Sequence, residues 1–213
     1  MIYEPGAAES PADIRSLVLP MLEQDLVPIV QLGHPVLRQS AAPYTGQLRD
    51  DELPALIELM RRVMHHAPGV GLAAPQIGIP LSIAVLEDAY APDPEAAEVR
   101  ERTPLEFFTI INPRYEALDG QTAAFYEGCL SFEGYQGVVE RHRSVRLDYD
   151  DESGTPRQRT FTGWPARIVQ HETDHLNGIV YVDKVLTRSL SSNAEYPRWA
   201  SPDIGEARRG LGF

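Results

Sequence analysis

Residues 170–178, QHETDHLNG, contain two histidines four positions apart, and residues typical of helix ends lie on both sides of the pair. Trp164-Pro165 precedes them and Asn177-Gly178 follows, which is typical punctuation for a helix over about 165–177. The pattern therefore lies on a helix, where residues four apart share one face. This placement constrains the rest of the fold, because such a face must meet either solvent or groups supplied by other elements.

His171 and His175 share that face, with β-carbons ~5 to 6 Å apart, so both can reach a single metal ion. Glu172 lies beside the pair and can take a proton from water at such an ion, a pattern typical of hydrolytic metal sites. The structural alternative is a solvated polar face on a surface helix. A catalytic site usually has three protein ligands, so the metal interpretation requires a third ligand from elsewhere in the chain.

Two residues are candidates for that third ligand. Cys129 is the only thiol, and in EGCLS at 127–131 it has Gly128 and polar residues around it where a core strand would be apolar. Its structural alternative is a small buried hydrophobe. Glu195, twenty residues after His175, is the other candidate, although an acid in the polar stretch SSNAEYPR is typically exposed. Cys129 is the better candidate.

The segment 69–78, GVGLAAPQIG, is the third chemically informative stretch. Gly69 and Gly71 let another backbone approach closely, so this segment can pair with an extended peptide as an added strand. Gln76 can then direct its amide donor at a developing oxyanion. Alternatively, the stretch is a turn that leads into a strand at 81–86, with Gln76 on the surface.

Two further helices are expected before the 69–78 segment. Ser10-Pro11-Ala12-Asp13 is typical of a helix start with a serine cap, and Pro20 is expected to limit that helix. Apolar residues recur with a 3.6-residue period in the region 51–66, which predicts a second helix there. The acidic stretch 88–104 is expected to be a surface loop with one helical turn after Asp93-Pro94.

The expected strands are short, rich in β-branched or aromatic residues, and bounded by proline or turn residues. They are 81–86, 106–111, and two hairpins that pair 114–119 with 121–126 and 144–150 with 157–162. Helices segregated from strands, without a repeating βαβ pattern, predict an α+β fold.

The composition limits the class of protein. With 213 residues, 43% of them hydrophobic and 23% charged, we expect a single globular domain over 1–213. A formal net charge of −12 argues against direct nucleic-acid binding and against anionic membranes. The single cysteine favours a reducing compartment, and we find neither a secretion signal nor a membrane-spanning run, so a cytoplasmic location is expected.

The stretches GVGLAAPQIG, EGCLS and QHETDHLNG occur in this order and together resemble the three signature motifs of peptide deformylases. The segment QLGHPVLR at 31–38 is similar to the N-terminal region of that family. The resemblance implies a hydrolase that removes the formyl group from the N-terminal formyl-methionine of newly made peptides and releases formate. It also implies an α+β fold of mixed, mainly antiparallel sheets packed around a central helix that carries the His-Glu-x-x-His motif.

The resemblance also assigns roles to site residues. It implies one divalent metal ion per chain, bound by Cys129, His171 and His175. Glu172 is the implied general acid/base, while Gln76 and the backbone N–H of Leu130 are implied to hold the formyl oxygen. The implied ion is Fe(II), replaceable by zinc, nickel or cobalt.

A slot for the methionine side chain is expected beyond the metal site, with the peptide backbone along Gly69 and Gly71. The candidate slot residues are Val70, Phe125, Trp164, Arg167 and Ile168. Their structural alternative is core packing without substrate contact. Gln136 stands where many members of the family have arginine, so the contact with the far end of the peptide is expected to differ.

Two acids near the site, Glu127 and Asp174, need partners if they are buried, and Arg141 is the candidate partner of one of them. The sequence leaves the oligomeric state open between monomer and homodimer. Two other functions stay open as alternatives, a zinc metallopeptidase that uses Glu195 and a non-catalytic metal-binding module. Glu172 argues against the second of these, because a purely structural metal site needs no adjacent base.

Overall fold

The computed structural model describes residues 11–90 and 93–213. Its α-helices are α1 (Pro11–Leu22), α2 (Glu52–His66), α3 (Pro94–Val99), α4 (Gly163–Leu176) and α5 (Gly205–Leu211). Short 3-10 helices are η1 (Pro35–Arg38), η2 (Ala74–Ile77), η3 (Tyr181–Asp183), η4 (Thr187–Ser189) and η5 (Tyr196–Arg198). The predicted helices at 51–66 and 165–177 are confirmed as α2 and α4, and α3 is the helical turn expected after Asp93.

The N-terminal helix departs from its predicted limit. Ser10, its predicted cap, lies outside the described residues. Pro20 does not end the helix, which continues to Leu22. A proline removes one backbone donor, but here it falls in the last turn of the helix. The preceding turns are held in place because Ile14 and Val18 pack in a buried cluster with residues of α2.

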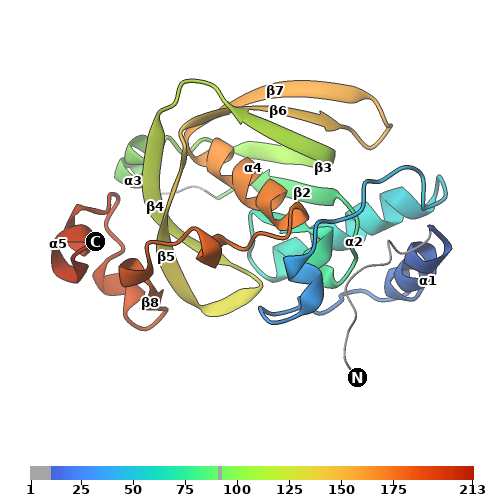
Figure 1. The fold of residues 1–213 in the computed structure, drawn as a ribbon, viewed down its shortest axis with the longest axis horizontal. Helices are drawn as coiled ribbons and strands as arrows, with labels where there is room; N and C mark the ends of the chain where they lie inside the picture. Colours follow the sequence, from blue (N-terminus) through green and yellow to red (C-terminus); the bar gives the residue numbers. More distant parts are fainter. Residues whose placement is uncertain (1–10, 91–92) are drawn as a thin grey trace.

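The strands form two antiparallel sheets (Figure 1). The strand order is β1-β2-β3-β6-β7 in the first sheet and β4-β5-β8 in the second. Their bounds are β1 (Gly71–Ala73), β2 (Ile83–Asp88), β3 (Leu105–Ala117), β4 (Thr122–Cys129), β5 (Phe132–His142), β6 (Ser144–Asp150), β7 (Pro156–Thr162) and β8 (Ser191–Ser192). The neighbouring strands in both sheets pair antiparallel, which agrees with the predicted α+β class.

One predicted hairpin is confirmed and the other is wrong. β6 pairs with β7 as expected. The segment 114–119, however, does not pair with 121–126, because β3 runs through it and pairs with β6 while β4 pairs with β5. The pairing with β6 places Ala117 opposite the buried Val145. The turn residues around Gly120 mark a crossing between the two sheets, which a local turn signal cannot distinguish from a hairpin.

The motif helix α4 contacts strands of both sheets and lies near the middle of the molecule (Figure 1). On one side, Ala166, Ile168 and Val169 pack with Ile110 and Leu147 of the first sheet in one buried cluster. On the other side, α4 contacts β5 of the second sheet. The polar residues of the motif are therefore held between two layers and do not form an open solvated face.

Both ends of α4 are fixed by local structure. Gly163 has a φ of +65°, and a Cβ at this position would lie 2.6 Å from the backbone oxygen of Glu101. The backbone N–H of Trp164 donates to that same oxygen at 3.3 Å. At the other end, the backbone N–H of Asn177 donates to Asp174 O at 2.9 Å. Fixed ends set the direction in which each side chain of the motif points.

The C-terminal segment packs against the second sheet. Tyr126 of β4 and Ala207 of α5 belong to one buried cluster. Arg100, which follows α3, donates to the backbone oxygens of Ser201 and Pro202 at 3.1 Å each. Across the described segments, no helix combines the length and the apolar character that a membrane crossing requires.

Candidate active site

α4 and the end of β4 bring three metal-ligating side chains together. The ligand atoms of Cys129, His171 and His175 all lie within 4.8 Å of one another, and Cys129 Sγ is 3.2 Å from His175 Nε2. In the part of the chain that the structure describes, no other histidine, cysteine and acidic side chains are grouped in this way. The helix supplies the two imidazoles one turn apart, and the second sheet supplies the sulfur.

The alternative third ligand, Glu195, lies elsewhere. Its side chain is 59% exposed and forms an ion pair with Arg198 at 3.4 Å. It precedes the short helix η5 and does not belong to the ligand cluster. The geometry therefore gives no support to a peptidase site in which Glu195 completes the ligand set.

The two histidines suit a bound cation in different ways. Burial, with the positive charges of His171 and Arg141, holds the pKa of His175 well below its ordinary value, so a neutral imidazole is available. Its Nδ1 is buried without a hydrogen-bond partner in the described residues. Burial also opposes protonation of His171, but interactions with Cys129 and Glu127 outweigh it and raise the pKa of His171 to about 10. A cation can replace the proton shared with the sulfur, and this donor set fits borderline ions such as zinc or ferrous iron.

Glu172 is a buried carboxylate that lines the same cleft as Cys129 and His171. Its Oε2 has no hydrogen-bond partner among the described residues. Burial raises the pKa of Glu172 to about 7, although the charges of His171 and Arg141 oppose the shift. A carboxyl group with a pKa near 7 can both accept and donate a proton near neutral pH. Gly71 leaves the necessary space, because a Cβ there would lie 2.5 Å from Glu172 Cδ.

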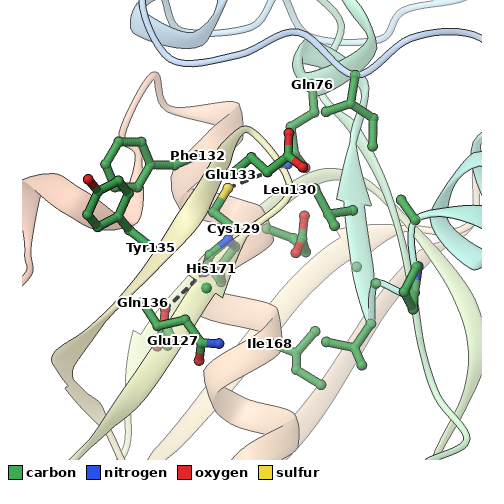
Figure 2. A pocket seen from close by; sticks show the side chains of 18 of the residues that line it. Gln76, Glu127, Cys129, Leu130, Phe132, Glu133, Tyr135, Gln136, Ile168 and His171 are labelled. Atoms are coloured by element: carbon green, nitrogen blue, oxygen red, sulfur yellow. Dashed lines mark hydrogen bonds and ion pairs between the residues drawn. The ribbon is translucent and has the colours of Figure 1, made fainter. Parts of the chain in front are cut away.

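Gln76 of η2 points toward the sulfur of Cys129 (Figure 2). Its Oε1 accepts a hydrogen bond from Ala73 N at 2.9 Å, which fixes the orientation of the amide. Its Nε2 therefore faces the site and donates to Ser131 Oγ at 3.3 Å and to Cys129 Sγ at 3.7 Å. Gln76 is buried, so the alternative of a surface turn is wrong. Leu130, next to the cysteine, lines the same cleft.

Arg141, predicted as the partner of one of the two buried acids, binds both of them. Arg141 donates to Glu127 at 2.6 and 2.9 Å and to Asp174 Oδ2 at 2.7 Å. Glu127 Oε2 also lies 2.9 Å from His171 Nδ1 (Figure 2). Burial alone would raise the pKa of Glu127, but Arg141 and the hydrogen bond with His171 hold it well below its ordinary value. An ionised Glu127 orients the ring of His171 through Nδ1, so the other ring nitrogen, Nε2, can bind a metal ion.

Cys129, His171 and Glu172 line a cleft of about 1060 Å³. The predicted substrate residues that also line it are Gly69, Val70, Gly71, Trp164, Arg167 and Ile168.

Of the predicted slot residues, Arg167 lines the cleft but also binds buried groups, and Phe125 does not line it. The Arg167 guanidinium donates to Glu127 Oε1 at 2.5 Å and to the backbone oxygens of Val139 and Ala123 at 3.0 and 2.6 Å. It is therefore committed to holding Glu127. Phe125 is not among the residues that line the cleft, because its ring packs 6.4 Å from the ring of Trp164 and lies under the Arg167 guanidinium.

Several residues that line the cleft had not been predicted. They come from the segment after α1, the end of α2, the region after α3, the start of β5 and the C-terminal segment, and include Leu26, Pro28, Ile29, His66, Arg100, Phe132, Tyr135, Asn193 and Tyr196. Phe132 and Tyr135 stack with ring centroids 5.6 Å apart (Figure 2). The apolar run 26–29 was an available signal. Asn193 and Tyr196 reach the cleft through tertiary packing alone and carry no local signal.

β1 is the edge strand of the first sheet, because it pairs with β2 on one side only. Gly71, the first residue of β1, and Gly69 and Val70, which precede it, also line the cleft. An edge strand that faces a cleft can accept an extended peptide as an additional strand. The cleft thus combines a backbone edge for binding with a cluster of reactive side chains.

Comparisons with known proteins agree with this geometry. Residues 26–190 match the family model described as polypeptide deformylase. Peptide deformylase 3 of Streptomyces avermitilis is 53% identical over 188 residues, which are 88% of this chain and 84% of that protein. The mitochondrial peptide deformylase of Homo sapiens is 34% identical over 200 residues, which are 88% of this chain and 82% of that protein.

Solved structures lead to the same family. A class I type b peptide deformylase from Acinetobacter baumannii, solved with Met-Ala-Ser bound, gives a TM-score of 0.67 at 33% identity and covers 75% of this chain and 98% of that one. The peptide deformylase of Thermotoga maritima gives a TM-score of 0.64 at 33% identity and covers 75% of this chain and 97% of that one. The chain therefore belongs to the polypeptide deformylase family of metal-dependent hydrolases, which remove N-formyl groups from nascent peptides.

Proposed function

We propose that the cleft removes the formyl group from formyl-methionyl peptides with one divalent metal ion held by Cys129, His171 and His175. The observation that supports this proposal is the grouping of those three ligand atoms within 4.8 Å, beside a cleft that Cys129, His171 and Glu172 line. An ion held there supplies a positive charge that makes water a better nucleophile near neutral pH and polarises the formyl group.

Glu172 is proposed as the general acid/base. Its carboxylate accepts a proton from water while the water oxygen forms a bond to the formyl carbon. It then returns that proton to the amide nitrogen of the peptide as the C–N bond breaks, so a free amine leaves together with formic acid, which loses its remaining proton to water as formate. The raised pKa of Glu172, about 7, supports both directions of proton transfer in one catalytic cycle.

Gln76 and the backbone N–H of Leu130 are proposed to stabilise the negative charge that develops on the formyl oxygen. The amide of Gln76 is already oriented by Ala73, so its Nε2 needs no large movement to donate to this oxygen. The contact that it would give up, 3.7 Å to Cys129 Sγ, is long and weak. Losing one such donor typically costs ~2.7 to 4 kcal/mol in the barrier.

The substrate is proposed to lie along β1 as an added strand, with its methionine side chain toward Val70, Trp164 and Ile168. The free edge of β1 and the apolar character of these side chains support this orientation. The relative from Acinetobacter baumannii was solved with Met-Ala-Ser bound. That peptide has the sequence expected of a deformylated N-terminus, which supports the same substrate class here.

The remaining assignments follow from composition and donor chemistry. We propose Fe(II) as the ion, with zinc, nickel or cobalt as substitutes, because the set joins one soft sulfur to two imidazoles. We also propose that residues 1–213 act as one catalytic unit in the cytoplasm, as a monomer or homodimer. The net charge of −12 disfavours direct nucleic-acid binding.

The decisive experiment compares Glu172→Ala with Glu195→Ala in anaerobically prepared protein. Formate release from formyl-Met-Ala-Ser should fall about 10²- to 10⁴-fold in Glu172→Ala, because the proton acceptor is lost. Metal content should stay at the wild-type level, since Glu172 is not a ligand. Glu195→Ala, at an exposed site outside the cluster, should keep both properties.

Cys129→Ala completes the test of the ligand set. It should lose the metal as well as activity, because two histidines alone hold an ion weakly. Wild-type formate release in Glu172→Ala, or full metal content in Cys129→Ala, would contradict the assignment.

A further inference from the structure

Lys184 is the only lysine in the sequence, which contains 19 lysine and arginine residues in total. It directly follows η3, and its side chain is 33% exposed. Its Nζ lies 2.7 Å from Oδ2 of Asp174, a carboxylate that is itself buried on α4. The one lysine of this chain is thus paired with a charge on the motif helix.

A continuous series of short contacts joins Lys184 to a metal ligand. Asp174 Oδ2 also accepts a hydrogen bond from Arg141 Nη1 at 2.7 Å. Arg141 holds Glu127 at 2.6 and 2.9 Å, and Glu127 Oε2 lies 2.9 Å from His171 Nδ1. Asp174, Arg141 and Glu127 are all buried. A change in charge at Lys184 can therefore reach His171 with little screening by solvent.

Lys184, at the far end of this series of contacts, lines a cavity that is separate from the cleft. A second cavity of about 740 Å³ is lined by Lys184, Asp174 and Tyr115, and it shares no lining residue with the cleft. There the hydroxyl of Tyr115 donates to Asp174 Oδ1 at 3.3 Å. Glu127 and His171, at the other end of the series, line the cleft. The buried ion pairs thus link two separate cavities.

We propose that Lys184 is a positioning residue for His171. Arg141 serves two carboxylates, and Lys184 supplies part of the positive charge that one of them, Asp174, requires. Without this ammonium group, Arg141 is the only cation that contacts Asp174 in the described segments, so it is drawn away from Glu127. A less firmly held Glu127 orients His171 less firmly. The inference rests on the proposed metal-binding role of His171.

A single lysine allows the charge to be changed chemically in the intact holoenzyme. Acetylation with an N-hydroxysuccinimide ester neutralises the amine, whereas amidination with methyl acetimidate enlarges it and keeps its positive charge. Both reagents also modify a free N-terminal amine. A Lys184→Arg variant treated in the same two ways is therefore the matched control, and mass spectrometry verifies the site and extent of modification.

The readouts are the rate at which EDTA removes cobalt from the cobalt-loaded protein and its visible absorption spectrum, which reports the cobalt coordination. Direct partners of metal-ligating histidines change metal affinity about 10- to 100-fold. Lys184 is further away, so we expect acetylation to speed cobalt loss about 3- to 10-fold and to alter the spectrum. Amidination should change the rate less than about 2-fold, and Lys184→Met should match acetylation.

Two outcomes would overturn the positioning role of Lys184. One is unchanged cobalt release and an unchanged spectrum after acetylation. The other is an equal effect of amidination, which would indicate steric disturbance instead of charge loss. Untreated protein separates this inference from the proposed function. If untreated protein binds no cobalt or releases no formate, both proposals fail. If untreated protein does both, but acetylation changes neither cobalt release nor the spectrum, only the positioning role of Lys184 is contradicted.

Discussion

Arg141 and Arg143 lie two residues apart at the end of β5, and each holds a glutamate through its Nε and Nη2 atoms. The hydrogen bonds from Arg141 to Glu127 are 2.6 and 2.9 Å long, and those from Arg143 to Glu101 are 2.7 and 2.6 Å. The side chains are 1% and 4% exposed in the first pair, but 38% and 40% exposed in the second. Two ion pairs of nearly equal geometry thus stand in very different surroundings.

The surroundings explain why the two pairs have different numbers of partners. Removing charges from water is costly, so a buried ion pair persists only when further groups satisfy its remaining hydrogen-bonding capacity. Glu127 accordingly contacts Arg167 and His171 as well as Arg141, and Arg141 also binds Asp174. In an exposed pair, water molecules satisfy the remaining hydrogen-bonding capacity. The additional partners around Glu127 give His171, the proposed metal ligand, a fixed orientation.

The largest predicted difference is between Arg141→Met and Arg143→Met. Removing one partner of a buried pair leaves uncompensated charge, so Arg141→Met should lower the free energy of unfolding by about 3 to 5 kcal/mol. Arg143→Met removes an exposed pair that water screens, so it should cost far less than Arg141→Met. Urea unfolding of both variants after treatment with a chelator measures the difference without a contribution from bound metal. Equal losses in the two variants would show that burial does not determine the strength of these pairs.

The second prediction concerns Glu172, a buried carboxylate without an ion-pair partner among the described residues. Its position depends on the space above Gly71, where a Cβ would lie 2.5 Å from Glu172 Cδ. Gly71→Ala should therefore displace the carboxylate. A displacement of about 1 Å at a reacting group can cost ~10²-fold in rate, so formate release should fall by about this factor. Metal content should not change, because Cys129 and the two histidines are untouched. A loss of metal in Gly71→Ala would show that more than the carboxylate has moved.

Features that depend on local sequence were predictable, whereas features that depend on contacts between distant segments were not. The two histidines were predictable because a helical spacing of four fixes their neighbourhood, and Arg141 was predictable because buried acids require a cation. The crossing of the chain from β3 to β4 was not predictable, since its turn residues resemble those of a hairpin and the true partners lie further along the chain. Lys184 was also missed, because its role depends on a contact with Asp174 that exists only after folding.

The third prediction compares the buried Arg141–Glu127 pair with the exposed Arg143–Glu101 pair by double-mutant cycles. The coupling free energy between Arg143 and Glu101 should be small and should decrease in 1 M salt, where the Debye length is about 3 Å. The coupling between Arg141 and Glu127 should be larger and nearly independent of salt, because counterions do not reach buried groups. Unfolding free energies of the single and double methionine and glutamine variants, at low and high salt, measure both couplings. A buried coupling that decreases with salt as much as the exposed one would contradict this interpretation.

The smallest predicted effect is a pH dependence at the exposed pair. The hydrogen bond with Arg143 lowers the pKa of Glu101 below its ordinary value of 4.5, despite an opposing contribution from burial. The folded protein therefore holds the ionised carboxylate better than the unfolded chain does. This stabilisation should be fully present above about pH 4.5 and should disappear as the pH falls through the lower pKa of the folded state. Because the pair is largely hydrated, its size should be on the order of 0.5 kcal/mol.

The measurement compares the unfolding free energies of wild-type protein and Glu101→Gln from pH 7 to pH 3. Their difference should shrink as the pH falls below 4.5, since the wild-type carboxyl then becomes as neutral as the amide. The same comparison in an Arg143→Met background should show little dependence on pH, because the cause of the lowered pKa has been removed. A difference that grows toward acidic pH would mean that Glu101 is stabilised in its protonated form, so Arg143 would not be its effective partner in solution.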